Sequence, residues 1–421
     1  MSSVDKGQFQ TQNEDLFEGA LLFLASWFLD PEKRSYDDIE YSCVSEEQKQ
    51  RHKNIYYAFP VLRYTTLESV STPEQRQKHI DWLNDYLLML VEDEEKFLEW
   101  IRFWVADLVQ NPHTKGANPI ACLFLGKEGC GKSFLTLLIK AIFGDSIVWQ
   151  TETPTANGDI LHEFNSALKN KLFIEFQEVN MRTMGSVADQ IKGFITSNEH
   201  RITHKGHDPI TVKATERLVF TTNNRCSLII NKGDRRNACF EVSNRFLGNE
   251  VYWNDAHAKL KDNNFIKDIT DYLLGIDLTG YNLRDRRPKT NYYKSLIQFS
   301  MPTELNFFRE KLFYGNTDLE EFKSSDGHYT FPSSRLFDLF SMWRKEVFKA
   351  KDETTQTAWT LRMKNFNEYG IVHRHLVSSN AFVLDIDTFK KKVFEDFDVE
   401  LDEPSRLTEL WSRIKSVKNE N

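Results

Sequence analysis

The sequence predicts an α/β fold in which a parallel-sheet core follows a helical region and precedes a C-terminal α+β region. From Ile120 to about Val242, short apolar runs alternate with segments of helical periodicity, the pattern of a parallel sheet. Before this stretch, from residue 14 to about 110, and after it, from Asn249 to Leu274, apolar residues recur mainly at helical spacing.

The N-terminal region, residues 1–112, is predicted to be a helical domain. Apolar residues recur at helical spacing over His79–Val91 and Asp93–Gln110. The earlier apolar run Ala20–Leu29 is too short to span a membrane and indicates a buried helix. Asn111 and Pro112 end the region, because a proline and its preceding residue disfavour helix.

The core is predicted to span residues 113–250, with a helical lid and linker over 251–295 that includes the basic connection Arg284–Pro288. Short apolar runs mark five strands: Ile120–Leu125, Ser146–Gln150, Lys171–Phe176, Arg217–Thr222 and Cys239–Val242.

Residues 296–421 are predicted to form the C-terminal α+β domain. The pattern gives helices over Glu304–Leu312, Ser334–Ala350 and Thr357–Tyr369 and a strand over Ala381–Leu384. Helices followed by strands suit a winged-helix DNA-binding domain, and a plain packing domain is the alternative. His373-Arg374-His375 has arginine where a His-hydrophobe-His nicking motif needs an apolar residue, so these residues are placed on a strand.

Composition restricts the class of protein. The chain has 421 residues, a net charge of −8 and five cysteines without a C-x-x-C pair, which favours a reducing compartment and no zinc site. A net negative charge argues against a generally basic nucleic-acid coat, although a motor can confine basic groups to a channel. With no signal peptide or membrane span in the pattern, we expect a soluble intracellular protein of host cytoplasm or nucleus, neither secreted nor membrane-bound.

A glycine-rich loop carries the strongest functional signal. Gly126-Lys127-Glu128-Gly129-Cys130-Gly131-Lys132-Ser133 follows an apolar strand and precedes an apolar-periodic helix that begins at Phe134, which is the context of a P-loop. Backbone N–H groups would cradle the phosphates of ATP, Lys132 would reach the β- and γ-phosphates, and Ser133 would hold Mg²⁺. The expected nucleotide-binding residues are Gly126, Glu128, Gly129, Cys130, Gly131, Lys132, Ser133 and Phe134.

A P-loop alone does not separate kinases, GTPases, transporters and motors, so a second motif is needed. An NTPase places a carboxylate at the end of a buried strand near the γ-phosphate. Glu178 follows such a strand and is the candidate for polarising the attacking water and for the Mg²⁺ site. Gln177 stands where an acid usually helps to bind Mg²⁺, and Glu175 interrupts the apolar run; strand alternation favours a surface position for Glu175 over one facing the site.

Two further polar groups complete a hydrolytic set. Asn223 or Asn224, after the strand Arg217–Thr222, could sense the γ-phosphate, and we favour Asn223 over a simple turn-forming pair. Arg235 or Arg236 could stabilise charge on a transferring phosphoryl group, and motors often supply this arginine from a neighbouring subunit.

The segment from Arg201 to Lys213 reads as a β-hairpin with a Gly-His-Asp-Pro turn. Lys205 and His207 would lie at its tip, where they could contact a nucleic-acid backbone. The spacing alone leaves a solvent-facing turn equally open.

Taken in order, these motifs resemble the superfamily 3 helicases, and most of all the poxvirus-type primase-helicase group of large DNA viruses, phages and mobile elements. The resemblance extends over residues 95–245 and more weakly to about 385. It is carried by Phe103–Pro112, Gly126–Ser133, Phe164–Leu168, Lys192–Thr196, Phe220–Asn224 and Asp234–Arg236.

The resemblance implies an AAA+ ATPase ring, usually a hexamer, that uses ATP and Mg²⁺ to translocate on single-stranded or forked DNA, typically 3′ to 5′. It implies that the N-terminal helical domain is a collar, that Lys205 and His207 contact DNA in the pore, and that Arg236, or else Arg235, acts in trans. Because no primase motif is recognised, a separate primase or initiator is expected. The alternatives are a superfamily 3 ATPase acting on RNA and a non-motor P-loop protein.

Overall fold

The computed structural model describes residues 37–40, 43–44, 46–57, 59–115, 119–151, 165–179, 188–203, 205, 208–313, 321–324, 328–348, 354–376, 379–399 and 401. The chain divides into two compact units, Met1–Pro60 and Val61–Asn421. In the first, the short strands β1 (Asp38–Glu40) and β2 (Ile55–Tyr57) pair in parallel, with α2 (Glu46–Arg51) between them in sequence. The predicted helical character is therefore wrong for these strands, and the predicted helix Ala20–Leu29 lies outside the described residues.

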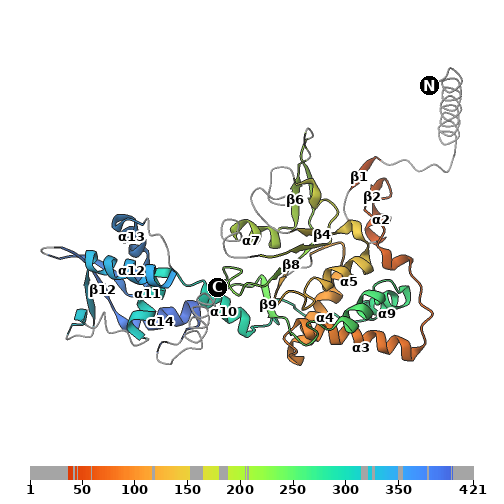
Figure 1. Ribbon diagram of the computed structural model, residues 1–421. Coiled ribbons are helices and arrows are strands. Elements are labelled where there is room, and N and C mark those ends of the chain that lie inside the picture. Colours follow the sequence, from red (N-terminus) through yellow and green to blue (C-terminus); the bar gives the residue numbers. More distant parts are fainter. Residues whose placement is uncertain are drawn as a thin grey trace, which may run out of the picture. The chain divides into compact units, whose positions relative to one another are not determined.

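The second unit is built on a parallel sheet of five strands in the order β4–β5–β8–β3–β9 (Figure 1). These are the five strands that the sequence predicts, with ends shifted by at most two residues: β3 (Ala121–Leu125), β4 (Val148–Thr151), β5 (Phe173–Phe176), β8 (Arg217–Thr222) and β9 (Asn237–Glu241). Every residue of β3, β5 and β8 is buried, as expected for strands covered on both faces.

Alternate residues of these strands contact different helical layers. On one face, α4 (Glu95–Gln110) sets Trp104 against Phe173 and Trp100 against Phe240, and α5 (Phe134–Phe143) follows the P-loop. On the other face, side chains such as Leu123, Ile174 and Phe220 join one apolar cluster with α7 (Ala188–Thr196) and α10 (Asn291–Phe299).

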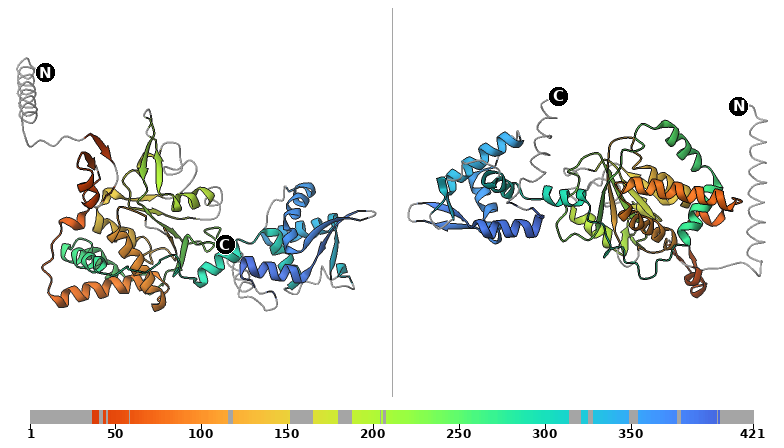
Figure 2. Two further views of the ribbon diagram at one scale, coloured as in Figure 1. Left: turned by 180° about the vertical axis from the view of Figure 1, so that it is seen from behind. Right: turned by 90° about the horizontal axis from the view of Figure 1, so that it is seen from below.

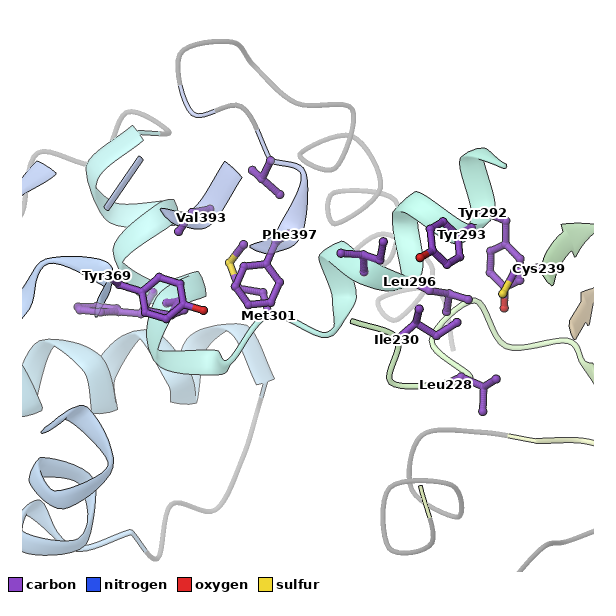
Figure 3. Packing of buried hydrophobic residues seen from close by; sticks show 14 of the residues in the cluster. Leu228, Ile230, Cys239, Tyr292, Tyr293, Leu296, Met301, Tyr369, Val393 and Phe397 are labelled. Atoms are coloured by element: carbon purple, nitrogen blue, oxygen red, sulfur yellow. The ribbon is translucent and has the colours of Figure 1, made fainter. Parts of the chain in front are cut away.

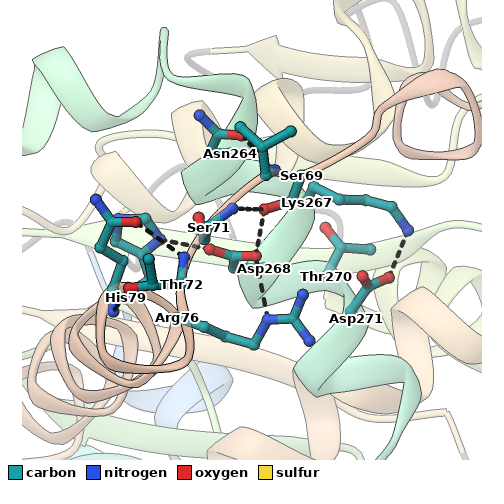
Figure 4. Close-up of polar contacts among 12 residues, drawn as sticks. Ser69, Ser71, Thr72, Arg76, His79, Asn264, Lys267, Asp268, Thr270 and Asp271 are labelled. Atoms are coloured by element: carbon teal, nitrogen blue, oxygen red, sulfur yellow. Dashed lines mark hydrogen bonds and ion pairs between the residues drawn. The ribbon is translucent and has the colours of Figure 1, made fainter.

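The helices before and after the core pack together. Helix α3 (Pro73–Leu90) contacts α9 (Asn263–Leu274), which follows α8 (Glu250–Lys259). The buried Asp268 on α9 accepts a hydrogen bond from Ser69 Oγ (2.7 Å), lies 2.7 Å from His79 Nδ1 and lies 3.4 Å from Arg76 Nε (Figure 4). Burial opposes ionisation of Asp268, but hydrogen bonds from Ser71, Ser69 and His79 outweigh it and lower its pKa. The boundaries drawn at residues 112, 250 and 295 stay predictions.

The connection from β5 to β8 carries α7 and an antiparallel hairpin, β6 (Glu199–Ile202) and β7 (Ile210–Lys213). Figure 1 shows this hairpin projecting from the sheet layer. The predicted hairpin is thus confirmed. In the chain it lies between β5, which is followed by Glu178, and β8, which is followed by Asn223.

The C-terminal part forms a smaller α+β module (Figure 2). Its elements are α11 (Thr303–Phe313), β10 (Tyr329–Pro332), α12 (Ser333–Phe348), α13 (Gln356–Met363), the 3-10 helix η5 (Lys364–Tyr369), β11 (Ile371–His375), β12 (Asn380–Leu384) and α14 (Ile386–Phe397). Its strands form an antiparallel sheet in the order β10–β12–β11. Buried side chains run without interruption from Leu228 and Tyr292, along α10, to Met301 and Phe397 in this module (Figure 3).

Candidate nucleotide site

The P-loop joins the end of β3 to the start of α5, as the sequence predicts. Gly129 and Gly131 have φ values of 75° and 95°, a region that favours glycine. A Cβ on Gly126 would lie 2.6 Å from Cys130 Sγ, and one on Gly131 would lie 2.0 Å from the ring of Trp253. The loop therefore requires glycine both for its backbone angles and for its close packing.

The side chain of Lys132 folds back across the P-loop. Its Nζ donates hydrogen bonds to the carbonyl oxygens of Gly126 (2.6 Å) and Lys127 (2.8 Å). The ammonium is thus held inside the ring of the loop, where a phosphate oxygen would be a stronger acceptor than either carbonyl.

Ser133 makes the contact that defines the site. Its Oγ donates a 2.7 Å hydrogen bond to Oε1 of Glu175, whose side chain is fully buried. The same carboxylate accepts hydrogen bonds from Thr136 Oγ1 (2.6 Å), Gln150 Nε2 (2.8 Å) and Thr221 Oγ1 (3.1 Å). A carboxylate offers about four lone-pair positions, so these four donors fill them.

This position corrects the surface interpretation of Glu175. Strand β5 lies between β4 and β8, so it is not an edge strand, and Glu175 faces α5 and the P-loop. The physical reason is that a fully satisfied carboxylate tolerates burial, whereas simple alternation treats any strand charge as solvent-facing.

Gln177 and Glu178 follow β5 at the carboxyl edge of the sheet. The amide N–H of Gln177 donates to the carbonyl of Thr151 (2.8 Å), and its side chain is partly buried. Glu178 is exposed and has a left-handed backbone with φ of 53°. Since β3 and β5 are both parallel to β8, Glu178 lies at the same edge of the sheet as the P-loop.

Asn223 and Asn224 also lie at this edge, directly after β8. The side chain of Asn224 accepts a hydrogen bond from the N–H of Cys226 (2.9 Å), and its own N–H donates to Thr222 Oγ1 (3.0 Å). Asn224 is thus the turn-forming residue, while Asn223 is exposed at the sheet edge. The role of Asn223 as a sensor of the γ-phosphate stays a prediction.

Arg235 and Arg236 lie at the opposite end of the strands from the P-loop, where the parallel strands begin. They precede β9, and the carbonyl of Arg236 accepts a hydrogen bond from the N–H of Ala121 at the start of β3 (2.8 Å). The five residues of β3 separate this end from the P-loop by roughly 16 Å. The structure therefore does not bring either arginine to the P-loop of its own chain.

Arg287 fixes the segment that carries these arginines. It donates hydrogen bonds to the carbonyls of Asn237 (2.5 Å) and Asp234 (2.7 Å) and stacks on the ring of Tyr293, 4.4 Å from its centroid. From the sequence, Arg287 was expected only as part of the basic connection Arg284–Pro288. Its contact with a segment about fifty residues earlier has no signal in the local pattern.

Aromatic side chains cover the helical side of the P-loop. Tyr86 Oη donates to the carbonyl of Gly131 (3.1 Å), and the buried Phe134 meets Tyr86 and Trp253 at ring-centroid distances of 5.2 and 5.6 Å. Burial raises the pKa of Tyr86 well above its usual value, so its phenol stays protonated as a donor. Phe134 was among the expected nucleotide-binding residues, whereas Tyr86 on α3 and Trp253 on α8 were not, because these helices come before and after the core in the sequence.

The predicted nucleic-acid contacts lie on the hairpin. Lys205 is exposed in the turn between β6 and β7, and His207 lies outside the described residues. At the hairpin base, Glu216 forms buried contacts with Lys115 Nζ and with His200 Nε2 (2.7 Å). Burial opposes the charged form of Glu216, but Lys115 and His200 outweigh this and lower its pKa.

Comparisons with known proteins give a fold and a partial sequence match. Residues 124–236 match the model of a family of unknown function, DUF5906. The chain is 25% identical over 234 residues to a protein named DNA primase-polymerase from Nitratiruptor phage NrS-1; the match covers 55% of this chain and 30% of the relative's length. The chain therefore spans less than a third of this relative.

The apo structure of the C-terminal region of the NrS-1 protein is similar to this chain. It superposes with a TM-score of 0.57 over 87% of this chain and 89% of that one, at 16% identity. A second apo form gives a TM-score of 0.56 at 17% identity. At this identity the similarity shows the mixed α/β fold with its central parallel sheet. No helix in the described part of the chain is long and apolar enough to cross a bilayer.

Proposed function

We propose that the chain is an ATP-dependent DNA helicase that takes part in the replication of a viral or mobile-element genome. The observation that carries the proposal is the buried hydrogen bond between Ser133 of the P-loop and Glu175 of β5. A P-loop serine paired with a strand carboxylate is the arrangement that binds Mg²⁺ with ATP in P-loop NTPases. The kinship with a phage protein named primase-polymerase supports a role in replication.

The residues present suit ATP and Mg²⁺. Hydroxyl and carboxylate oxygens are the ligands that Mg²⁺ prefers, and the metal would neutralise charge on the phosphates. Because four donors occupy Glu175, it acts through Ser133: it accepts the hydrogen bond from the Ser133 hydroxyl, which leaves the lone pairs of Oγ for the metal. Lys132 would bind phosphate oxygens, Glu178 would orient water, and Asn223 would contact the γ-phosphate.

The position of Arg235 and Arg236 supports a ring. Neither reaches the P-loop of its own chain, so an arginine from this segment can act only in the site of a neighbouring copy. Arg235 is exposed, whereas Arg236 has a buried Nε without a hydrogen-bond partner among the described residues, which an incoming acceptor would satisfy. We therefore propose a homo-oligomer, a hexamer by resemblance, with Arg236 as the arginine in trans.

The hairpin supports action on nucleic acid. It rises between the strand ends that carry Glu178 and Asn223 and presents Lys205 to solvent. We propose that Lys205, together with His207, binds single-stranded DNA in the pore of the ring and moves it 3′ to 5′. The collar role of residues 1–112 and a separate priming protein remain parts of this proposal.

The test is ATP hydrolysis by a species of measured mass. We expect single-stranded DNA to stimulate hydrolysis in an oligomer and Lys132→Ala to abolish it, because the variant lacks the cation that binds the phosphates. Light scattering gives the mass, and phosphate release gives the rate. Stimulation of hydrolysis by RNA but not by DNA would instead favour an RNA-directed ATPase. A monomer whose hydrolysis is stimulated by neither would refute the proposed motor function.

A further inference from the structure

The turn that carries Arg235 and Arg236 is closed from the inside by the residue before them. Oδ1 of Asp234 accepts hydrogen bonds from the backbone N–H groups of Arg236 and Asn237, each at 3.0 Å, and from the Asn237 side chain at 3.2 Å. These bonds fix the shape of the turn. Its orientation depends on contacts from other elements.

Arg287 supplies such a contact from the connection before α10. Its Nη1 donates to the carbonyl of Asn237 (2.5 Å), and its Nη2 donates to the carbonyl of Asp234 (2.7 Å). The two residues between these carbonyl groups are Arg235 and Arg236. One planar guanidinium therefore fixes the backbone on both sides of the two arginines.

The guanidinium of Arg287 is itself held in place. It stacks on the ring of Tyr293, on the first turn of α10, and Nη2 also donates to the Tyr293 hydroxyl (3.2 Å). That hydroxyl donates to the carbonyl of Asp234 (3.2 Å), and burial raises its pKa, so it stays protonated as a donor. Thr290 Oγ1 donates to the carbonyl of Cys239 on β9 (2.5 Å), which ties the start of α10 to that strand. Figure 3 shows Tyr293 and Cys239 together.

Arg287 and Arg236 use their side chains differently. Both Nη groups of Arg287 donate to carbonyl groups of its own chain, so Arg287 is not placed to reach a neighbouring subunit. Arg236 has a buried Nε without a hydrogen-bond partner among the described residues. The first arginine therefore holds the turn, and the second has a donor left for an incoming acceptor.

We propose that Arg287 is the positioning residue for the arginine that acts in trans. The inference rests on the proposed function, in which Arg236 completes the ATP site of a neighbouring subunit. Arg287 directs Arg236 by fixing the carbonyl groups on either side of it. A displacement of about 1 Å in a group that acts on the reacting atoms can cost about 10²-fold in rate. Lysine at position 287 keeps the charge but lacks the planar fork that bridges two carbonyl groups.

The first measurement is steady-state ATP hydrolysis by Arg287→Lys. We expect kcat to fall about 10²-fold with KM for ATP within about threefold of the parent, because the arginine acts on the transition state. Arg286→Lys is the matched control and should hydrolyse ATP as the parent does. Arg286 is the preceding residue and also lies over a tyrosine ring (Tyr281, 4.6 Å), but its ion pair is with Glu99 (3.7 Å).

Mixed oligomers separate a positioning role from a structural one. Lys132→Ala lacks a working P-loop but keeps the Arg287 contacts, so mixing it with Arg287→Lys creates sites in which an intact P-loop faces an intact turn. Equal amounts should give about a quarter of the parent rate, since one site in four then has both parts. A subunit that has lost its fold would give no recovery. Tyr293→Phe keeps the stacked ring, removes the hydroxyl, and should show a smaller loss with the same recovery.

Arg236→Ala mixed with Lys132→Ala is the reference for these experiments. If this reference mixture does not recover hydrolysis, the trans arginine of the proposed function is refuted, and this inference with it. If the reference recovers, two results overturn the role of Arg287 alone: hydrolysis by Arg287→Lys at the parent rate, or no recovery when Arg287→Lys is mixed with Lys132→Ala.

Discussion

Replacing Glu175 by glutamine should weaken metal-dependent hydrolysis while leaving the fold in place. The change keeps the shape of the side chain but removes the charge that accepts the 2.7 Å hydrogen bond from Ser133 Oγ. A hydrogen bond to a charged acceptor contributes about 1.5–3 kcal/mol, which corresponds to about 10- to 100-fold in rate or Mg²⁺ affinity. The same range is typical of residues that orient a metal ligand. Single-turnover hydrolysis at increasing Mg²⁺ would show both a lower maximum and a higher half-saturation.

The controls separate a positioning role from a structural one. Glu68→Gln makes the same chemical change at an exposed site before α3 and should leave hydrolysis unchanged. Glu175→Gln combined with Gln177→Glu returns an acid to the same face at the strand end and should recover part of the loss. If Glu175→Gln hydrolyses ATP within about threefold of the parent at every Mg²⁺ concentration, which is less than the smallest expected loss, the role given to Glu175 is refuted.

Two other predictions concern the hairpin. Lys205→Ala should keep basal hydrolysis and lose strand separation in an unwinding assay; loss of both together would count against a role confined to DNA contact. Glu216→Gln leaves Lys115 buried without its carboxylate and should lower the free energy of unfolding by about 3–5 kcal/mol. Since Glu216 has a lowered folded-state pKa, its contribution is present above its ordinary pKa of 4.5 and lost as pH falls through the lower folded value; chemical denaturation at pH 7 and in acid measures it, and a parent-like value at pH 7 would refute it.

Much of the core could be predicted because its signals are local. The apolar runs of β3, β5 and β8 are continuous since both faces of the sheet are covered, and the P-loop pattern fixes where β3 ends and α5 begins. The same local patterns gave the hairpin and the strand that carries His373. They failed over residues 38–57, where three-residue strands are too short to show a period.

Glu175 could not be placed from the sequence because its partners are distant along the chain. Thr136, Gln150 and Thr221 come from three different elements, and only their convergence makes burial of the carboxylate favourable. One clue was available: residues two apart on a strand share a face, so Glu175 lies on the same side as Gln177. Glu175 therefore supplies a carboxylate two residues before Gln177 on the same face, where Gln177 itself lacks the usual acid.

The same sheet offers a contiguous path from the nucleotide site to the hairpin. After β5, Val179 donates its N–H to the carbonyl of Thr221 (3.1 Å) and accepts a hydrogen bond from Thr222 Oγ1 (2.7 Å), so the segment after Glu178 is tied to the strand that ends in Asn223. That strand is buried along its whole length, and Glu216 precedes it. Under the proposed function, a shift of β8 in response to the γ-phosphate would therefore act on the buried contacts of Glu216 at the hairpin base, because close-packed strands transmit strain.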